Sequence, residues 1–401
     1  MEVKTFYDLL TPAGQTVLQD AEALQPRESD FLAHYNLLAR RFPPGLARAA
    51  LETAILRQEA AGKFPFANQM YFTRPALEQA SGYEVSTYRA RRFNAFPRLA
   101  DLGCSIGGDT LALAAVAPVL GMDLDPLRLA IAQANLVAMG LAHAARFIQA
   151  DLRADLPLAP NPALGVFFDP ARRINGRRVF SVRDYLPPLS MIEAWLPRFP
   201  ALSVKISPGV KLEELSAYDA EIEFISVHGG LKEAVLWFGP LKTASRRATL
   251  LPGPLTLLPA AGRFDPQDRR LPLSEPQAYL YEPDPAVLRA GLVQDLGLQL
   301  KAAQLDPDIA YLTSGQFTPT PFAHAYALEA WFPFSLKRLR EALREQRVGR
   351  LVVKKRGSPL QPEALIKELR LTGDQERTLF LTHLRGRPIA ILSTGRLKIE
   401  G

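Results

Sequence analysis

Four aspartates are the residues best suited to hold a ligand, because each ends or directly follows a short apolar run. They are Asp101, Asp123, Asp151 and Asp169, with the runs at 98–102, 118–123, 145–149 and 164–168. Carboxyl ends of parallel strands meet at one edge of a sheet, where ligands of such folds bind. The four acids are therefore predicted to share one binding site.

The segment RLADLGCSIGGDT (98–110) predicts a strand, a glycine-rich turn and the start of a helix. A dinucleotide site has G-x-G-x-x-G, whose middle glycine lets the pyrophosphate approach closely. Ser105 stands at that position, and Asp101 precedes the first glycine, Gly103. An acid before a turn without a pyrophosphate cradle favours a ligand with amino and sulfonium cations. S-adenosylmethionine is therefore preferred to NAD, with Asp123 as the usual acceptor for ribose hydroxyls.

Periodic patterns divide the rest of the chain into four segments. Residues 1–97 are predicted to be a helical domain, because apolar residues recur every three or four positions up to about residue 66. Residues 98–247 alternate apolar runs with helical patterns, which predicts a doubly wound α/β domain. Residues 248–281 are a proline-rich linker with little regular pattern, and 282–401 a compact α/β domain.

The series DLGCSIGGD, GMDLDP, QADL and FFDPARR resembles the class I S-adenosylmethionine-dependent methyltransferases, most closely their trimethylguanosine synthase branch. The whole chain further resembles bacterial methyltransferases with a C-terminal THUMP-like domain, through MYFTRPALEQAS, YRARRF, DPARR, LYEPDPAVLRAGLV and KKRG. The resemblance implies a Rossmann-like methyltransferase domain, an N-terminal helical domain and a C-terminal α/β THUMP-like domain. It also implies S-adenosylmethionine as the cofactor.

The resemblance assigns roles to individual residues. The residues expected to hold the cofactor are Asp101, Gly103, Cys104, Ser105, Gly107, Asp123, Leu124, Asp151, Leu152, Thr73 and Gln79. Within this set Asp123 takes the ribose, and Asp151 with Leu152 meets the adenine. Asp169 and Pro170 are expected beside the methyl group, as the catalytic pair.

The segment 169–173, called the acceptor segment below, departs from the pattern of enzymes that methylate exocyclic amines of bases. Those enzymes carry Asp/Asn-Pro-Pro and an aromatic residue, whereas this chain continues Asp169-Pro170 with Ala171 and two arginines. Stacking on a base is expected from Phe168, Tyr71 or Phe72 instead. The two arginines bind a phosphate or a purine edge, or they only cap a surface loop. They are Arg172 and Arg173.

The amino-acid composition argues against several other classes of protein and site. The single cysteine, Cys104, excludes an internal disulfide and a cysteine metal cluster, and the five histidines show no ligand spacing, so no metal is expected. Cys104 inside the glycine turn is expected to pack beside the ligand rather than to act as a nucleophile. No stretch reaches transmembrane length and the start does not resemble a signal peptide, so we expect a cytoplasmic enzyme.

Most of the net charge of +7 lies in the last segment, 282–401. Its basic residues cluster in the helical stretch SLKRLREALREQR and at a strand end, where Lys354, Lys355 and Arg356 are expected to contact RNA phosphates. The predicted function is methylation of a base in structured RNA, such as tRNA or rRNA. The alternatives are a non-catalytic RNA-binding or assembly protein that keeps the fold, and a small-molecule methyltransferase.

Overall fold

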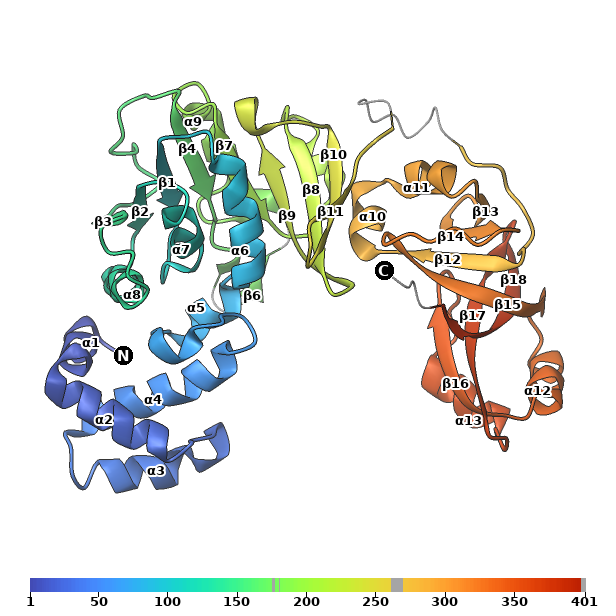
Figure 1. The fold of residues 1–401 in the computed structure, drawn as a ribbon, viewed down its shortest axis with the longest axis horizontal. Helices are drawn as coiled ribbons and strands as arrows, with labels where there is room; N and C mark the ends of the chain where they lie inside the picture. Colours follow the sequence, from blue (N-terminus) through green and yellow to red (C-terminus); the bar gives the residue numbers. More distant parts are fainter. Residues whose placement is uncertain (175–176, 180, 261–269, 398–401) are drawn as a thin grey trace. The chain divides into compact units, whose positions relative to one another are not determined.

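The computed structural model describes residues 1–174, 177–179, 181–260 and 270–397 (Figure 1). It divides the chain into two compact units, which are treated separately below. The first is Met1–Glu221 with Glu233–Thr243, and the second is Ile222–Lys232 with Ala244–Gly401. The helical segment before residue 98 thus belongs to the same compact unit as the sheet that follows it.

The first unit begins with helices, as its apolar periodicity predicts. They are α1 (Val3–Leu10), α2 (Pro12–Ala23), α3 (Phe31–Leu38), α4 (Pro44–Ala60), α5 (Arg74–Gln79) and α6 (Tyr83–Ala90). The longest, α4, buries alanine, leucine and isoleucine side chains along most of its length. Thr11 and Thr73 accept hydrogen bonds from the first-turn amides of α2 and α5, and these caps fix where the two helices begin.

The sheet of the first unit has the strand order β9-β7-β4-β1-β2-β3. The bounds are β1 (Arg98–Leu102), β2 (Val119–Asp123), β3 (Ala145–Gln149), β4 (Leu164–Phe168), β7 (Leu202–Ile206) and β9 (Gly230–Trp237). All neighbours are parallel except β9, which runs antiparallel to β7. Helices α7 (Gly108–Ala114) and α8 (Pro126–Ala138) connect β1 to β2 and β2 to β3. The predicted doubly wound α/β domain is confirmed. β4 is buried throughout and reads as a continuous apolar run, whereas the equally buried β7 includes Ser203 and Lys205.

Two predicted helices of this unit are shorter than their patterns suggest. The pattern at 186–196 yields a 3-10 turn at Leu189–Met191 and one turn of helix, α9 (Ile192–Trp195). Pro187 and Pro188 explain the late start, since neither supplies a backbone N–H group. The pattern at 211–217 yields only the 3-10 turn Leu212–Leu215.

The second unit contains a sheet of seven strands in the order β13-β14-β12-β15-β18-β17-β16. Their bounds are β12 (Tyr279–Pro283), β13 (Ala303–Asp306), β14 (Ile309–Ser314), β15 (Ala323–Pro333), β16 (Val348–Lys355), β17 (Gln375–Leu384) and β18 (Arg387–Arg396). The helices are α10 (Pro285–Ala290), α11 (Val293–Gln299), α12 (Leu336–Glu345) and α13 (Pro362–Leu369). Successive residues of β17 belong to different apolar clusters: Leu379 and Leu381 join α12 and α13, and Phe380 joins Tyr311 and Tyr326. The predicted C-terminal α/β fold is confirmed.

The segment 248–281 is more regular at its start than its prolines suggest. Strand β10 (Arg246–Leu251) runs parallel to β8 (Glu221–Val227) and antiparallel to β11 (Leu255–Leu257). Gly253, with φ of +68°, adopts the left-handed conformation in the turn between β10 and β11. Two strands therefore replace the first part of the predicted linker, and residues 261–269 lie outside the described part of the chain.

Candidate functional site

A cavity of about 370 Å³ lies at the carboxyl ends of β1, β2 and β4 in the first unit. Pockets of this size hold small molecules. The structure brings eleven of the sequence-predicted site residues to its lining. They are Gln79, Gly103, Cys104, Ser105, Asp123, Leu124, Asp151, Leu152, Asp169, Pro170 and Arg172. The expectation that the acids at successive strand ends lie together is met by three of the four.

The other predicted residues lie elsewhere. Thr73 caps the start of α5, and Gly107 packs on α8, where an added Cβ would stand 3.1 Å from Ala132. Asp101 is fully buried behind the glycine turn and is not part of the lining. The side chain of Arg173 falls outside the described part of the chain. The three basic residues at 354–356 belong to the second unit.

Gly103 brings the glycine turn against the acceptor segment. Its φ is +82°, and an added Cβ would stand 2.6 Å from the Asp169 carbonyl oxygen. The Asp169 amide donates to the Leu102 carbonyl at 3.0 Å, so the end of β4 is tied to the end of β1. Ser105 is also left-handed, and its amide donates to Asp123 Oδ2 at 2.9 Å. The glycine was expected to let a ligand approach, and here it lets two loops of the site meet.

Asp101 is held as a neutral acid. Burial raises the pKa of its carboxyl to about 8, and the nearby Asp109 raises it further, against one hydrogen bond donated by Thr110 Oγ1 at 2.5 Å. Its Oδ1 is buried and has no partner among the described residues. The expected direct contact of Asp101 with a cofactor is therefore not what the geometry provides.

Replacing Asp101 with asparagine is expected to change how stability depends on pH. The folded chain keeps a proton on Asp101 that the unfolded chain releases near pH 4, so the wild-type free energy of unfolding falls as pH rises from about 4 to 8. The Asp101→Asn variant lacks this loss, and its stability relative to wild type rises by up to about 1.4 kcal/mol per pH unit in that window. Urea unfolding at pH 5, 6.5 and 8 measures it; parallel curves for the two proteins would contradict the assignment.

Asp123 and Asp151 differ in how free their carboxylates are. Asp123 accepts from the backbone amides of Ser105 and Asp125, each at 2.9 Å, which fixes its orientation at the cavity wall. Both oxygens of Asp151 accept from the Arg153 side chain, and these bonds lower the pKa of Asp151 to about 2. Among the described residues Asp123 accepts only from backbone amides, whereas Asp151 already carries a cationic partner.

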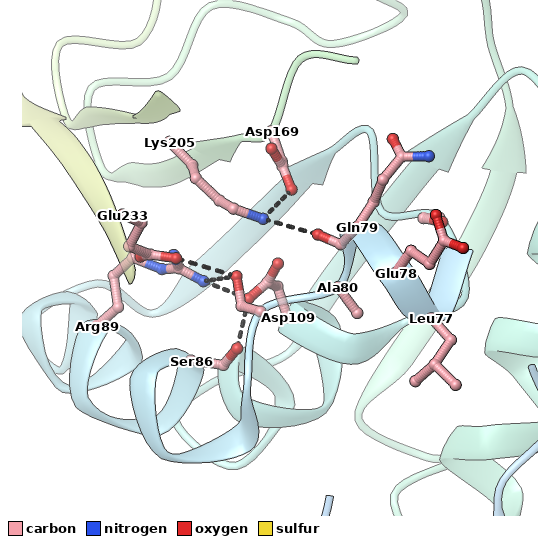
Figure 2. Close-up of polar contacts among 12 residues, drawn as sticks. Leu77, Glu78, Gln79, Ala80, Ser86, Arg89, Asp109, Asp169, Lys205 and Glu233 are labelled. Atoms are coloured by element: carbon pink, nitrogen blue, oxygen red, sulfur yellow. Dashed lines mark hydrogen bonds and ion pairs between the residues drawn. The ribbon is translucent and has the colours of Figure 1, made fainter. Parts of the chain in front are cut away.

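Asp169 is clamped from one side. Lys205 on β7 is 2% exposed, and its Nζ lies 2.6 Å from Asp169 Oδ2 and 3.5 Å from the Gln79 carbonyl oxygen (Figure 2). Asp169 Oδ1 has no hydrogen-bond partner in the part of the chain that the structure describes. Two backbone hydrogen bonds of 3.0 Å join Ala171 to Leu186 and hold the segment after Pro170. The carboxylate thus presents one oxygen from a rigid mount.

A buried ionic network lies behind this clamp (Figure 2). Arg89 on α6 donates to Asp109 and to Glu233, and Asp109 also accepts from Ser86 at 2.6 Å. Burial alone would lower the pKa of Arg89, but Asp109 and Glu233 reverse that and raise it. For Asp109 burial favours the neutral acid, yet Arg89 and Lys205 lower its pKa. Both groups are therefore charged, and they join α6 and α7 to the strand β9.

The charged residues of the cavity lining are mostly paired. Five aspartates line it, against three arginines: Asp109, Asp123, Asp125, Asp151 and Asp169, and Arg128, Arg153 and Arg172. Four of these aspartates already have a cationic partner: Asp109 pairs with Arg89, Asp125 with Arg128, Asp151 with Arg153 and Asp169 with Lys205. Asp123 has no cationic partner among the described residues, and Arg172 is the one lining arginine without an acidic partner among them. A single free arginine is a poor match for the pyrophosphate of a dinucleotide.

Other chemistries have less support at this site. Burial raises the pKa of Cys104, which keeps its thiol neutral and argues against a nucleophile. Among the described residues no group of three or more His, Cys, Asp or Glu side chains could hold a metal ion. Likewise, in that part of the chain, no helix has the length and apolar character to cross a membrane.

The aromatic residues expected to stack on a base are packed in the core. Tyr71 is 7% exposed and meets Phe6 edge to face, and Phe72 lies against Phe64. Phe168 is fully buried against Trp195. The expectation of stacking by these three rings is therefore wrong in this conformation, because their apolar surfaces cover helices rather than the cavity.

The sequence reasoning missed Asn135, and it gave no role to Lys205, Arg89 or Glu233. Asn135 is fully buried on α8, accepts from the Tyr71 amide at 2.7 Å and donates to the carbonyls of Tyr71 and Ile106. It ties the segment before α5 to the glycine turn. The available signal was an asparagine within the apolar run LAIAQANLVA, since a buried amide needs partners.

The predicted phosphate contacts of the second unit are used internally. Lys354 Nζ lies 2.5 Å from Glu282 Oε2 and over the ring of Tyr326, and the Arg356 guanidinium lies over Tyr311. Lys355 Nζ donates to the Leu360 carbonyl at 2.9 Å. Burial alone would lower the pKa of Lys354, but the hydrogen bond and charge of Glu282 raise it, so Lys354 is charged. The expectation that this cluster faces RNA is not supported, since its cations already have partners.

Comparisons with known proteins show which families and solved structures this chain resembles. A family described as THUMP domain-like matches residues 323–394, and one described as a domain of unknown function matches residues 2–60. Two relatives from Mycobacterium tuberculosis, strains CDC 1551 and H37Rv, are each 36% identical over 348 residues, which are 83% of this chain and 92% of theirs. Each is named an uncharacterized S-adenosylmethionine-dependent methyltransferase. A solved structure from Porphyromonas gingivalis W83, described as a methyltransferase, has a TM-score of 0.75 at 22% identity and covers 92% of this chain and 98% of its own.

Proposed function

Because the chain belongs to the S-adenosylmethionine-dependent methyltransferases, we propose that it methylates a base of structured RNA, such as tRNA or rRNA. The observation that carries the acceptor side of this proposal is the mounting of Asp169. One of its carboxylate oxygens is fixed by the buried Lys205, and the other is available to the cavity at the end of β4.

The cofactor, when bound, supplies a methyl group on a positively charged sulfur. In the proposal Asp123 accepts the ribose hydroxyls from the end of β2, and the turn Gly103–Ser105 holds the methionine end. Leu152 and Asp151 border the adenine. Asp123 supports this arrangement, because its carboxylate lines the cavity and has no cationic partner among the described residues.

The acceptor side requires alignment more than acid or base strength. Methyl transfer is an in-line displacement, so a rigid mount that orients the acceptor supplies much of the rate. Asp169 Oδ1 and the Pro170 carbonyl accept the N–H groups of an amine and stabilise the positive charge that develops on its nitrogen. The bridge between Ala171 and Leu186 keeps this segment from moving.

Three observations support a nucleic-acid acceptor. The THUMP domain-like match at 323–394 and the motif likeness to the trimethylguanosine synthase branch both suggest RNA. Leu186, 48% exposed, and Arg172 line the cavity, and a base that leaves its stack can lie on an apolar side chain or on a guanidinium plane. The acceptor surface is therefore assigned to these two residues instead of to an aromatic ring.

Transfer of labelled methyl groups tests the proposal. Total RNA from a strain that lacks the protein is expected to accept label from S-adenosylmethionine, and RNA from the parent strain much less, because its sites are already methylated. Label that enters only a protein or metabolite fraction would overturn the RNA assignment. No label in any fraction would favour the alternative of a non-catalytic RNA-binding or assembly protein that keeps the fold.

Replacing Lys205 with methionine is expected to lower the turnover rate by roughly 10²-fold, because a displaced Asp169 misaligns the acceptor. Cofactor affinity should change little, since Lys205 does not line the cavity. Lys205→Arg keeps the cation and is expected to recover part of the rate. Calorimetry measures the cofactor affinity, and methyl transfer measures the turnover rate. Equal losses of turnover rate in both variants, or a parallel loss of cofactor affinity, would assign Lys205 a merely structural role.

A further inference from the structure

A second cavity of about 370 Å³ lies in the second unit, where α12 and α13 end. Four arginines line it: Arg340, Arg344, Arg347 and Arg370. Its apolar lining comes from Leu343, Val348, Leu369 and Leu371, and the rest from the short segment Thr372–Asp374. Asp374 is the one carboxylate among these lining residues, so the cations outnumber it by four to one.

Few hydrogen bonds or ion pairs within the described part of the chain hold these four arginine side chains. Arg340 donates to the Glu368 carbonyl at 2.8 Å, and Arg347 lies 3.5 Å from Asp374 Oδ2 in a pair that is mostly exposed. Such an exposed pair contributes little. Arg344 and Arg370 have no acceptor among the residues that the structure describes. At least three guanidinium groups can thus turn toward a ligand.

Compensation of helix dipoles explains only part of this cluster. Cations in the last turn of a helix are favourable, which accounts for Arg344 on α12 and for Arg340, which binds a carbonyl at the end of α13. Arg347 and Arg370 follow the helices, each with a left-handed backbone at φ of +53° and +51°. Glycine is the usual residue at such a position, because a side chain makes the left-handed backbone conformation less favourable. Arginine at both positions therefore adds a cation at a cost in backbone conformational energy.

The cavity wall is built by two close backbone approaches. An added Cβ on Gly349 would overlap the Gly373 carbonyl oxygen, and one on Gly373 would overlap that of Arg347. Gln375 N donates to the Arg347 carbonyl at 3.0 Å. The backbone that carries Arg347 is therefore fixed against the segment Thr372–Asp374.

We propose that this arginine cavity binds phosphate groups of the RNA backbone, an inference that rests on the proposed function. Guanidinium groups match phosphate oxygens with two parallel hydrogen bonds, and several around one cavity can hold adjacent phosphates. The contrast with the cluster at 354–356 supports the choice, since Lys354 and Arg356 share the partly buried Glu282, whereas Asp374 is the one carboxylate on the lining of the arginine cavity.

Salt dependence of RNA binding tests this inference. The probe is a fluorescent single-stranded RNA of about twenty nucleotides, with a hairpin of equal length beside it. The variant Arg344→Gln/Arg347→Gln/Arg370→Gln is expected to flatten the slope of log affinity against log salt by about two units, since each lost contact removes roughly 0.7 to 0.9.

The matched control removes equal charge outside the cavity, as Lys337→Gln/Arg350→Gln/Lys367→Gln; all three side chains are exposed. Its slope should change by less than one unit, and melting temperatures verify that both triple variants fold. Identical slopes for the two variants would overturn the cavity as a phosphate site. If the slopes are identical and the wild type still methylates RNA, the proposed function stands without the phosphate site. A wild type that neither binds nor methylates RNA would overturn both the phosphate site and the proposed function.

Discussion

Replacing Asp169 with alanine is expected to reduce methyl transfer by roughly 10²- to 10³-fold while the chain still binds its cofactor. The size follows from removing one preorganised electrostatic partner of a reacting group. Asp169 is the carboxylate at the end of β4 whose second oxygen faces the cavity, and its amide holds β4 against β1 through backbone alone. Alanine keeps that backbone bond. Rates with RNA from a strain that lacks the protein measure the loss.

The controls for this variant separate chemistry from folding. Asp169→Ala leaves the buried Lys205 without its carboxylate, so Asp169→Asn, which keeps an oxygen for Lys205 Nζ, is the milder change. With its amide oxygen on Lys205, asparagine presents an N–H group to the cavity, so it is expected to lose methyl transfer about as alanine does while its stability stays closer to that of the wild type. An Asp169→Ala chain that methylates RNA at the wild-type rate would contradict the acceptor role.

Replacing Asp123 with alanine is expected to weaken S-adenosylmethionine or S-adenosylhomocysteine binding by about 10- to 100-fold. A hydrogen bond to a charged acceptor contributes about 1.5–3 kcal/mol, and the variant loses the acceptor of the ribose hydroxyls. It also frees the Ser105 amide, which Asp123 holds in the glycine turn. Asp123→Asn should lose less, since it keeps one oxygen for that amide. Calorimetry on the three proteins gives the dissociation constants.

Asp151 supplies the internal comparison for Asp123. Its carboxylate is bonded to Arg153 through both oxygens, so Asp151→Ala is expected to cost clearly less affinity than Asp123→Ala. NAD should produce no binding heat with any of these proteins. Equal losses in the two alanine variants would contradict the ribose role of Asp123, and tight binding of NAD would reopen the dinucleotide alternative.

The strands of the first unit follow from local pattern. The apolar runs 98–102, 145–149 and 164–168 match the bounds of β1, β3 and β4. β4 is buried throughout and carries a continuous apolar sequence, whereas the exposed positions of β1 and β3 carry Arg98, Arg146 and Gln149. The glycine turn, Asp123, Asp151 and Asp169 each lie at or just after the end of a parallel strand, so their meeting at one edge is a consequence of sheet topology. This part of the site is within reach of sequence reasoning.

The ionic network behind Asp169 could not be predicted in the same way. Arg89 and Glu233 are 144 positions apart and meet only because β9 pairs with β7 beside the helix α6. The prediction for the cluster at 354–356 fails for the same reason, since its partner Glu282 comes from a strand 72 positions earlier in the chain. A charged residue in the sequence does not reveal whether tertiary structure supplies its counter-ion.

Nucleoside mass spectrometry tests the central claim, methylation of an RNA base, most directly. Total RNA is digested from the parent strain, from a strain that lacks the protein, and from that strain supplied with either the wild-type chain or Asp169→Ala. One methylated nucleoside is expected to disappear with the protein, to return with the wild-type chain and to stay absent with the variant. Identical nucleoside profiles in all four samples would contradict the account.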